Sequence, residues 1–461
     1  HDGDGLQDRG ITRDLKWGTP IPTNRPGLKK YEGKVMYVWF DAPIGYLSIL
    51  KHNVDDWEKW LINSNWVQFM AKDNVPFHTV IFPSTLMGFN KNNTKKLPLV
   101  TNLSATEYLN YEGSKFSKSE NKGIFGDDVM ALSEKLGIKY LGMGFNPNTK
   151  RDDVPVMPKG RYNIMREYMP KMGSLGLDMM LRTSTIQVNL DYSSEIDMVK
   201  KFRVSLALQP LATAIFAASP FTEGKPNGFQ SYRSHIWTDT DPDRCGILPF
   251  VFEEGMGFEA YLDHVLNVPM YFVCREGIYH DVSGKSFKDF MKGTLEGFEG
   301  QVPTIADWED HMSTLFPEVR LKKFLEMRGA DGGTWSKICA LPALWVGLLY
   351  DNQSLDEAWH MVKDWKHEDH QYLRTHVPRD ALSVPFKNGT VQDFAKKMLN
   401  ISAKGLERRA FLNNTGEDER IFLKSLYETV ESGKTTAQLM LDRYHSDWNG
   451  NIGKVFEDCS F

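Results

Sequence analysis

The sequence predicts a mixed fold of helices and strands whose character changes near residue 129. Before that point, the apolar and aromatic run KVMYVWFD at 34–41 ends in an aspartate, which is typical of a buried strand in an α/β fold. After it, TSTIQVNLD at 183–191 alternates apolar and polar residues, which is typical of a half-buried strand. The length of 461 residues indicates two or three domains, at roughly 150 residues each. We therefore expect an α/β segment over 1–129 and a separate domain over 130–461.

The composition is that of a globular protein and argues against several function classes. Apolar residues make up 41% and charged residues 25%, and the net charge of −5 gives no overall positive field to recruit nucleic acid. The four cysteines are scattered without a CxxC pair, which argues against a zinc site or a disulfide scaffold and suits a reducing compartment. No apolar run reaches the roughly 20 residues of a membrane helix, so ICALPALWVGLLY at 338–350 is expected to be a buried element.

These features predict a cytoplasmic location and no membrane partner. The chain begins with His1 rather than Met, so we expect the natural N-terminus to lie upstream. A plastid-targeting peptide therefore stays an open alternative. The oligomeric state is not predicted by any pattern in the sequence.

Further elements of the first segment follow in order. APIGY at 42–46 breaks the strand, NVDDWEKWLINSNW at 53–66 has its apolar residues at helical spacing, and 67–88 has the pattern of a strand, a polar turn and an apolar helix. Polar groups at strand ends are where ligands bind in open α/β sheets. Taken singly, Trp39 and His78 are more simply interpreted as core residues. The lysine-rich stretch SKFSKSENKG at 114–123 is, by itself, more simply a solvated turn.

Five motifs together change that interpretation. They are ITRDLKWGTPIP (11–22), YVWFDAPIGYLSI (37–49), FMAKDNVPFH (69–78), ATEYLNYEGSKFSKS (105–119) and GIFGD (123–127). Together they resemble methionyl-tRNA synthetase of the eukaryotic type, a class I enzyme, over about residues 1–128. The resemblance implies a fragment of the class I nucleotide-binding fold, with methionine, ATP and tRNA as partners.

This resemblance also implies roles for individual residues. The positions that match the methionine pocket are Trp39, Ala42, Pro43, Tyr46 and His78. An apolar, aromatic pocket suits a thioether, because sulfur packs well against rings. Asp73 matches the segment near the adenylate, where its carboxylate would accept ribose hydroxyls.

The lysine-rich stretch gains a role from the same resemblance. KFSKS matches the family's Lys-Met-Ser-Lys-Ser loop, with Phe116 in place of Met. Lys115 and Lys118 would then meet the charge that grows on departing pyrophosphate, an effect on the order of 3 kcal/mol for a well-placed group. The family's His-x-Gly-His signature and its helical anticodon-binding domain are absent from the sequence. We therefore expect a fragment that does not form methionyl-adenylate unaided.

The second segment combines helical and strand patterns. We expect a strand at 138–145, and in 183–191 Gln187 and Asn189 share the polar face, which either faces water or lines a ligand cavity. A helix is expected over 193–216, with a capping box of Ser194 and Asp197.

Three local features of this segment bear on the prediction. Pro210 is expected to kink or end a turn of the helix. The stretch 231–246 crowds His, Trp and Asp, but without HxH or HExxH spacing we do not expect histidine to bind a metal. EVRLKKFLEMRGADGG at 318–333 alternates apolar and charged residues, and its simplest interpretation is a solvated strand edge.

Six stretches of this segment combine into a second resemblance. They are GFNPNTKRDDVPVMPKGRYNIMREYMP, LGLDMMLRTSTIQVNLDYSSE, ALQPLATAIFAASPFTEGKPNGF, YRSHIWTDTDPDR, PEVRLKKFLEMRGADGG and CALPALWVGLLYD. They resemble the plant and proteobacterial type of glutamate–cysteine ligase from about residue 130 to the C-terminus. The resemblance implies an α+β fold similar to glutamine synthetase, with an antiparallel sheet curved around the active site. It also implies a reaction in which ATP phosphorylates the γ-carboxylate of glutamate and the amine of cysteine attacks the acyl phosphate.

The second resemblance assigns the following roles. Arg233 and Arg161 would bind glutamate and its phosphorylated form, because arginine holds carboxylate and phosphate bidentately. Trp237 would pack nearby, and Tyr271 matches a position that contacts cysteine. Glu326 would be a ligand of Mg²⁺, which bridges nucleotide phosphates, and Arg328 would contact those phosphates. Gln187 and Asn189 would line the cavity, so the resemblance favours the cavity interpretation of that strand face.

The sequence also departs from this family. Nothing matches its earliest segment, whose carboxylates supply most of the magnesium ligands, and Cys339 has no evident partner. Three hypotheses therefore stay open. The chain is a glutathione-pathway ligase, a methionyl-tRNA synthetase, or an inactive junction of two truncated parts that lacks a Pro/Gly/Ser-rich linker near 128–130.

Overall fold

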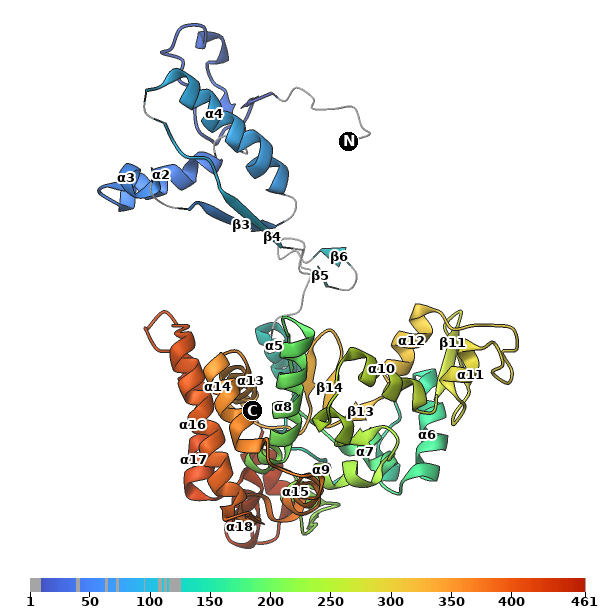
Figure 1. Ribbon diagram of the computed structural model, residues 1–461. Coiled ribbons are helices and arrows are strands. Elements are labelled where there is room, and N and C mark those ends of the chain that lie inside the picture. The colour runs from blue at the N-terminus through green and yellow to red at the C-terminus, as the bar shows by residue number, and fades with distance from the viewer. Residues whose placement is uncertain are drawn as a thin grey trace. The chain divides into compact units, whose positions relative to one another are not determined.

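The computed structural model describes residues 10–38, 42–62, 65–71, 74–94, 96–106, 110–111, 114–115 and 126–460. The chain divides into two compact units, His1–Leu136 and Gly137–Phe461 (Figure 1). The boundary expected after residue 129 falls within helix α5 (Gly126–Leu136). Within the described ranges, no helix is both long enough and apolar enough to cross a membrane.

The first unit is built around two parallel strands. β3 (Val67–Ala71) pairs with β4 (Asn102–Thr106), and helix α4 (Phe82–Asn92) connects them (Figure 1). Parallel strands need such a crossover, and α4 buries Phe82 and Leu86. The strand and the apolar helix expected within 67–88 are therefore confirmed. The unit's other strands and α-helices are β1 (Thr12–Arg13), β2 (Val35–Met36), α2 (Gly45–Asn53), α3 (Trp57–Ile62), β5 (Asn110–Tyr111), β6 (Ser114–Lys115) and α5.

Two expectations for this unit need correction. In the described part of 34–41, only β2 is a strand, and it pairs antiparallel with β1 instead of joining the parallel pair. The expected start of the helix over 53–66 is also wrong. Asn53 is the last residue of α2, and the next helix, α3, begins only at Trp57. Val54 separates the two helices, since its backbone is extended, with φ −132° and ψ 118°.

The second unit mixes many helices with short strands that pair mostly antiparallel. Its helices are α6 (Gly160–Met172), α7 (Gly176–Arg182), α8 (Glu195–Ile215), α9 (Tyr232–Ile236), α10 (Phe258–Asn267), α11 (Phe287–Met291), α12 (Ile305–Met312), α13 (Trp335–Leu349), α14 (Asn352–Val362), α15 (His367–Asp380), α16 (Val391–Arg409), α17 (Lys424–Ser432), α18 (Thr436–His445) and α19 (Val455–Asp458). Its strands are β7 (Val188–Leu190), β8 (Phe221–Thr222), β9 (Lys225–Pro226), β10 (Cys245–Gly246), β11 (Phe272–Arg275), β12 (Ile278–Asp281), β13 (Phe316–Pro317), β14 (Val319–Leu321), β15 (Leu325–Met327), β16 (Pro385–Phe386) and β17 (Gly389–Thr390).

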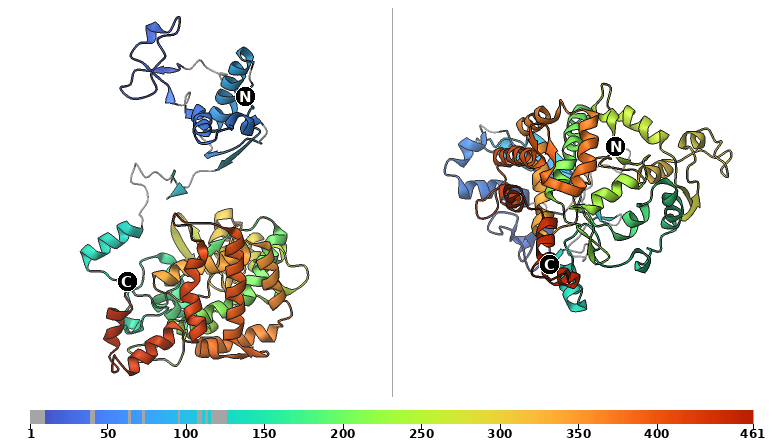
Figure 2. Two further views of the ribbon diagram at one scale, coloured as in Figure 1. Left: turned by 90° about the vertical axis from the view of Figure 1, so that its left-hand side faces the viewer. Right: turned by 90° about the horizontal axis from the view of Figure 1, so that it is seen from below.

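Helix α8 lies at the centre of the core of this unit. Helices α14, α15 and α16 pack against it, and α13 packs against α16 (Figures 1 and 2). The helix predicted over 193–216 is confirmed. The buried element expected at 338–350 is also confirmed, since 338–349 belong to α13 and Tyr350 follows it. Pro210 does not end α8, because the residues on both sides of it are buried and tertiary packing outweighs one missing hydrogen bond.

The N-terminus of α8 is capped in a slightly different way from that expected. The Ser194 hydroxyl accepts a hydrogen bond from the Asp197 amide at 3.2 Å, as in a capping box. The Asp197 carboxylate, however, accepts from the amide of Ser193 at 2.8 Å and not from that of Ser194.

The strand expected at 138–145 is wrong. Leu141 and Phe145 each form one isolated bridge, and no strand lies between them. The cause is the close approach of this segment to the turn at 329–334. A Cβ atom at Gly144 would lie 2.4 Å from Cγ of Asp331, so a glycine is required there.

Candidate functional site

A three-stranded antiparallel sheet carries one apolar and one polar face. The strand order is β14-β15-β7, and in one register row Arg320 faces Glu326, which faces Asn189. In the neighbouring row, Leu321, Leu325 and Leu190 are all buried in the main core. Since side chains alternate along a strand, the polar row lies on the opposite face. The predicted alternation of 183–191 is thus confirmed, and Gln187 and Asn189 are both exposed.

Three cations surround one carboxylate on the polar face. Glu326 is buried and pairs with Arg320 at 2.9 and 3.0 Å, with Lys322 at 3.1 Å, and with Arg328. Burial raises the pKa of Glu326, but Arg328 and Arg320 outweigh burial and hold that pKa below its ordinary value. Burial, helped by Arg320, lowers the pKa of Arg328 to about 10. The cluster therefore keeps an excess of positive charge. The interpretation of 318–333 as a solvated strand edge is wrong, because the residues of β14 and β15 are buried or half-buried.

A pocket beside this cluster joins three of the residues predicted from the sequence. Arg233, Trp237 and Arg328 line it together with Ser234, Phe316, Pro317 and Glu318. Arg233 comes from α9, Trp237 from the short turn Trp237–Asp239 that follows it, and Arg328 is the residue directly after β15. The Arg328 guanidinium lies 5.7 Å from the centre of the Trp237 ring.

Arg233 is fixed at the back of the pocket by buried groups. It donates a hydrogen bond from Nη2 to the carbonyl of Arg328 at 2.8 Å, and its Nη1 lies 4.0 Å from Oδ1 of Asp331. Asp331 in turn accepts hydrogen bonds from the amide of Ala218 and from the hydroxyls of Ser219 and Ser231. The hydrogen bond and the ion pair therefore favour one orientation of the guanidinium.

Two buried donors in this region have no acceptor within the described residues. They are Nε1 of Trp237 and Nε of Arg320. A buried N–H without a partner costs about 1–3 kcal/mol, so such a donor indicates an acceptor supplied by a ligand or by water. Together with Arg233 and Arg328, these donors favour an anion such as a carboxylate or a phosphate.

Tyr271 and Arg161 lie in a separate cluster of side chains. The Tyr271 hydroxyl donates to Asp241 at 2.9 Å, and the Arg244 guanidinium lies 3.6 Å from the centre of its ring. Burial raises the pKa of Tyr271, and its hydroxyl is engaged within the protein. The Arg161 guanidinium lies over the Phe272 ring at 5.6 Å, and its buried Nε has no acceptor in the described part of the chain.

The side chains of Tyr271 and Arg161 are separate from the pocket that holds Arg233 in the sense that they do not line it. Phe316, however, lines that pocket and also packs against the apolar cluster that contains Tyr271. The two groups are therefore neighbours through Phe316.

The described residues do not by themselves fit a magnesium ion. The oxygens of Glu326 are engaged by three cations, and within the described ranges no group of three His, Cys, Asp or Glu side chains has the geometry to hold a metal. Magnesium prefers several oxygen ligands in octahedral geometry. The metal role of Glu326 thus stays a prediction.

In the first unit, the structure brings together Tyr46 and His78. The Tyr46 hydroxyl lies 3.2 Å from Nε2 of His78, whose Nδ1 lies 2.9 Å from the carbonyl of Asn74. Because a carbonyl oxygen can only accept, Nδ1 donates to it, and in a neutral ring Nε2 accepts from the Tyr46 hydroxyl. Pro43 and His78 are buried, while Ala42 is exposed.

The other residues predicted for the first unit cannot be compared in the same way. Trp39, Asp73 and Lys118 lie outside the described residues, and for Lys115 only the backbone is described, in β6 opposite Asn110. Their roles stay predictions.

Sequence reasoning missed Arg320, Lys322 and Asp331. The alternation in VRLKKFLEMR placed Arg320 and Glu326 on charged positions of strands, but not opposite each other. The residues that donate hydrogen bonds to Asp331 are 100 to 113 positions away in the sequence, and no local pattern shows such contacts.

Comparison with known proteins assigns both parts of the chain. Residues 127–458 match the model of the glutamate-cysteine ligase family 2, and residues 3–154 match that of the class I tRNA synthetases (M). A pocket with a pair of buried arginines beside a polar sheet face is typical of a protein that binds small anions. The chain belongs to the glutamate-cysteine ligase family 2. The two family matches together confirm both resemblances seen in the sequence.

Similar curated proteins come from plants. The chain is 56% identical to glutamate–cysteine ligase B, chloroplastic, of Oryza sativa subsp. japonica over 333 residues, which are 72% of this chain and 66% of the relative. It is 55% identical to the chloroplastic glutamate–cysteine ligase of Nicotiana tabacum and 54% identical to that of Arabidopsis thaliana, over 63% of each relative. The chain thus spans slightly less than two thirds of the length of these relatives.

Proposed function

We propose that the second unit binds glutamate and ATP and joins glutamate to cysteine as γ-glutamylcysteine. A γ-carboxylate oxygen attacks the γ-phosphorus of ATP and ADP leaves. The cysteine amine then attacks the acyl carbon, phosphate leaves, and the amine loses a proton. Both steps pass through groups that carry more negative charge than a free carboxylate, so fixed cations lower both barriers.

The observation that carries this proposal is the convergence of Arg233, Arg328 and Trp237 on one pocket, together with the buried Trp237 N–H that has no acceptor among the described residues. Two guanidiniums held by the protein offer a carboxylate or acyl phosphate charge-assisted hydrogen bonds without reorganisation. The 54–56% identity to plant ligases supports the same substrates. Magnesium, when bound, would neutralise charge on the nucleotide phosphates.

The finer expectations from the sequence belong to this proposal. We propose that β14, β15 and β7 are part of a curved sheet like that of glutamine synthetase, and that Arg161, Tyr271, Gln187 and Asn189 contribute to substrate binding around it. The chloroplastic relatives support the plastid alternative for the location, and a cytoplasmic location stays a prediction.

The test is product formation by the purified full chain with glutamate, cysteine and ATP. We expect γ-glutamylcysteine and ADP in equal amounts, and a loss of about a hundredfold in kcat/KM for Arg233→Lys. The matched control is Arg203→Lys, because Arg203 also donates to carbonyls, those of Val251 and Glu253, but lies outside the pocket. An absence of product from the wild-type chain contradicts the proposal that this chain is itself an active ligase.

A second candidate function, activation of methionine by the first unit, runs against the expectation that this fragment does not form methionyl-adenylate unaided, but two observations favour it. The Tyr46–His78 contact unites two residues of the predicted methionine pocket, and residues 3–154 match the class I tRNA synthetases (M). The test is methionine-dependent exchange of pyrophosphate into ATP. Exchange that is lost in Tyr46→Ala supports this function, and no exchange in the wild-type chain contradicts it.

A further inference from the structure

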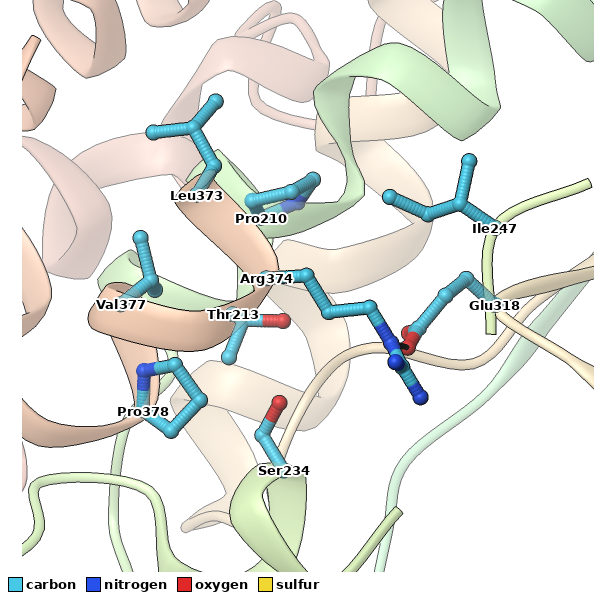
Figure 3. Close-up of a pocket in the computed structure, with 9 residues that line it drawn as sticks. All are labelled: Pro210, Thr213, Ser234, Ile247, Glu318, Leu373, Arg374, Val377 and Pro378. Atoms are coloured by element: carbon cyan, nitrogen blue, oxygen red, sulfur yellow. Dashed lines mark hydrogen bonds and ion pairs between the residues drawn. The ribbon is translucent and has the colours of Figure 1, made fainter. Parts of the chain in front are cut away.

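Arg374 lines a pocket next to the one that holds Arg233. It comes from α15, and this second pocket shares Ser234 and Glu318 with the first (Figure 3). Arg374 itself is not among the residues that line the first pocket. It therefore touches the walls of the proposed substrate site from outside.

Arg374 contacts three segments that meet at these walls. Its Nη2 donates to the carbonyl of Trp237 at 2.9 Å. Its Nε lies 3.4 Å from Oε1 of Glu318 (Figure 3). The backbone of Gly246 lies against the guanidinium, where a Cβ atom would be 3.2 Å from Cζ, and Gly246 has a φ of +101°. The Gly246 carbonyl in turn accepts from the amide of Glu318 at 3.0 Å.

Among the described residues that line the first pocket, Glu318 alone carries an acidic group. Its side chain is 16% exposed, and it acts on the charge of Arg233, since Asp331 and Glu318 both oppose the lowering of the Arg233 pKa that burial causes. A carboxylate that turned toward Arg233 or Arg328 would neutralise the cations that an anionic substrate needs. Instead, this carboxylate is paired with Arg374.

We propose that Arg374 is a positioning residue that holds Glu318 away from the arginines of the pocket and fixes the backbone of Trp237. The proposal rests on the proposed function, in which that pocket binds the substrate carboxylate and its phosphorylated form. It assigns Arg374 no contact with substrate. The predicted consequence of losing Arg374 is a competing internal anion in the pocket.

This consequence distinguishes positioning from a merely structural role. If Arg374 only stabilises the fold, removal of Glu318 as well leaves the defect unchanged or enlarges it. If Arg374 acts by restraining Glu318, replacement of the competing carboxylate by a neutral amide restores anion binding. The pair therefore calls for a double-mutant cycle.

The experiment measures binding of inorganic phosphate to the full chain by titration calorimetry. The variants are Arg374→Gln, Glu318→Gln and the double variant, with Lys363→Gln on an exposed position near the start of α15 as the control. We expect Arg374→Gln to raise the Kd about tenfold, and the double variant to return within about twofold of the wild type. Lys363→Gln is expected to bind like the wild type.

Three results overturn the proposal. They are a wild-type chain that does not bind phosphate, an Arg374→Gln variant that binds as tightly as the wild type, and a double variant that binds as weakly as Arg374→Gln. The product assay reports on the proposed function separately. A chain that forms no γ-glutamylcysteine but shows the expected rescue refutes the ligase activity and leaves the positioning role intact.

Discussion

At the scale of single residues, Asp331 links several parts of the site. Its carboxylate is fully buried, accepts three hydrogen bonds, and lies opposite Arg233. Removing one partner of a buried ion pair is costly, because the other charge stays buried without compensation.

We therefore predict that Asp331→Asn lowers the free energy of unfolding by about 3 kcal/mol. The measurement is denaturant unfolding, with the exposed Asp364→Asn as the control for a change of charge alone. Equal stabilities of the two variants would show that the Asp331 network contributes little.

His370 gives the second unit a dependence of stability on pH. Burial lowers its pKa to about 4, and both ring nitrogens lack a partner within the described residues. Below pH 6.5, His370 is protonated in the unfolded chain, whereas in the folded chain it stays neutral until about pH 4. Stability is therefore fully present above the unfolded pKa and is lost as the pH falls, by up to about 3 kcal/mol for this residue.

We predict that His370→Phe reduces the loss of stability between pH 6.5 and 4. The ring of His370 stacks on Phe252 at 4.5 Å, so phenylalanine preserves the contact. The measurement is the unfolding midpoint as a function of pH, with the exposed His360→Phe as the control. A pH dependence identical to that of the wild type would contradict the assignment.

At the scale of elements, the sheet β14-β15-β7 and the turn after it position the site. The turn at 329–334 follows β15 directly and lies against the segment of Gly142 and Gly144. We predict that Gly144→Ala destabilises the second unit by about 3 kcal/mol, since its Cβ would overlap the Asp331 side chain. Gly88→Ala in α4 is the control, because no atom lies within 4 Å of its Cβ position.

The measurement for this prediction is thermal unfolding of both variants, followed by a probe of the second unit such as near-ultraviolet circular dichroism. If Gly144→Ala melts at the wild-type temperature, the close approach of the two segments is not present in solution.

Elements with a regular pattern could be predicted from the sequence, and elements shaped by distant contacts could not. The alternation of 183–191, the helix over 193–216 and the buried α13 all follow from local patterns. The failed strand at 138–145 depends on two glycines packing against residues almost two hundred positions away. Pro210 shows the same effect, since packing around α8 overrides a local helix breaker.

In the candidate site, too, residues within recognisable motifs could be predicted and residues that depend on distant contacts could not. Arg233, Trp237, Arg328 and Glu326 were named from motifs, and the structure places the first three in one pocket with Glu326 bonded to Arg328. Arg320, Lys322 and Arg374 could not be predicted, because their roles depend on which segments become neighbours. Arg233, Trp237 and Arg328 line one pocket although they come from separate parts of the chain, and Arg374 of α15 lines the pocket beside it, so no sequence spacing relates these residues.

At the scale of the whole molecule, the first unit exposes large apolar side chains. Trp17 is 85% exposed, Phe69 75% and Trp60 59%. In its described residues, the parallel pair β3–β4 has no third strand beside it. Exposed apolar residues on a strand without neighbours favour aggregation.

We predict that the full chain elutes from gel filtration as concentration-dependent oligomers or aggregates, and that Phe69→Ser shifts it toward the monomer. Ile196→Ser is the control, since Ile196 is 84% exposed but belongs to α8 in the second unit. A sharp monomer peak for the wild-type chain at all concentrations would contradict this account.

The two family matches overlap over residues 127–154, the region in which α5 ends and the second unit begins. Because the chain spans slightly less than two thirds of its plant relatives, activity of the chain itself is the central claim to test.

The most direct measurement follows oxygen transfer from glutamate labelled with ¹⁸O in its γ-carboxylate. The purified full chain is incubated with this glutamate, cysteine and ATP, and the phosphate released is analysed by mass spectrometry. The account predicts one ¹⁸O atom in each phosphate for every γ-glutamylcysteine formed, because the acyl phosphate gives up the labelled oxygen with its phosphoryl group. Unlabelled phosphate, or no product at all, would contradict it.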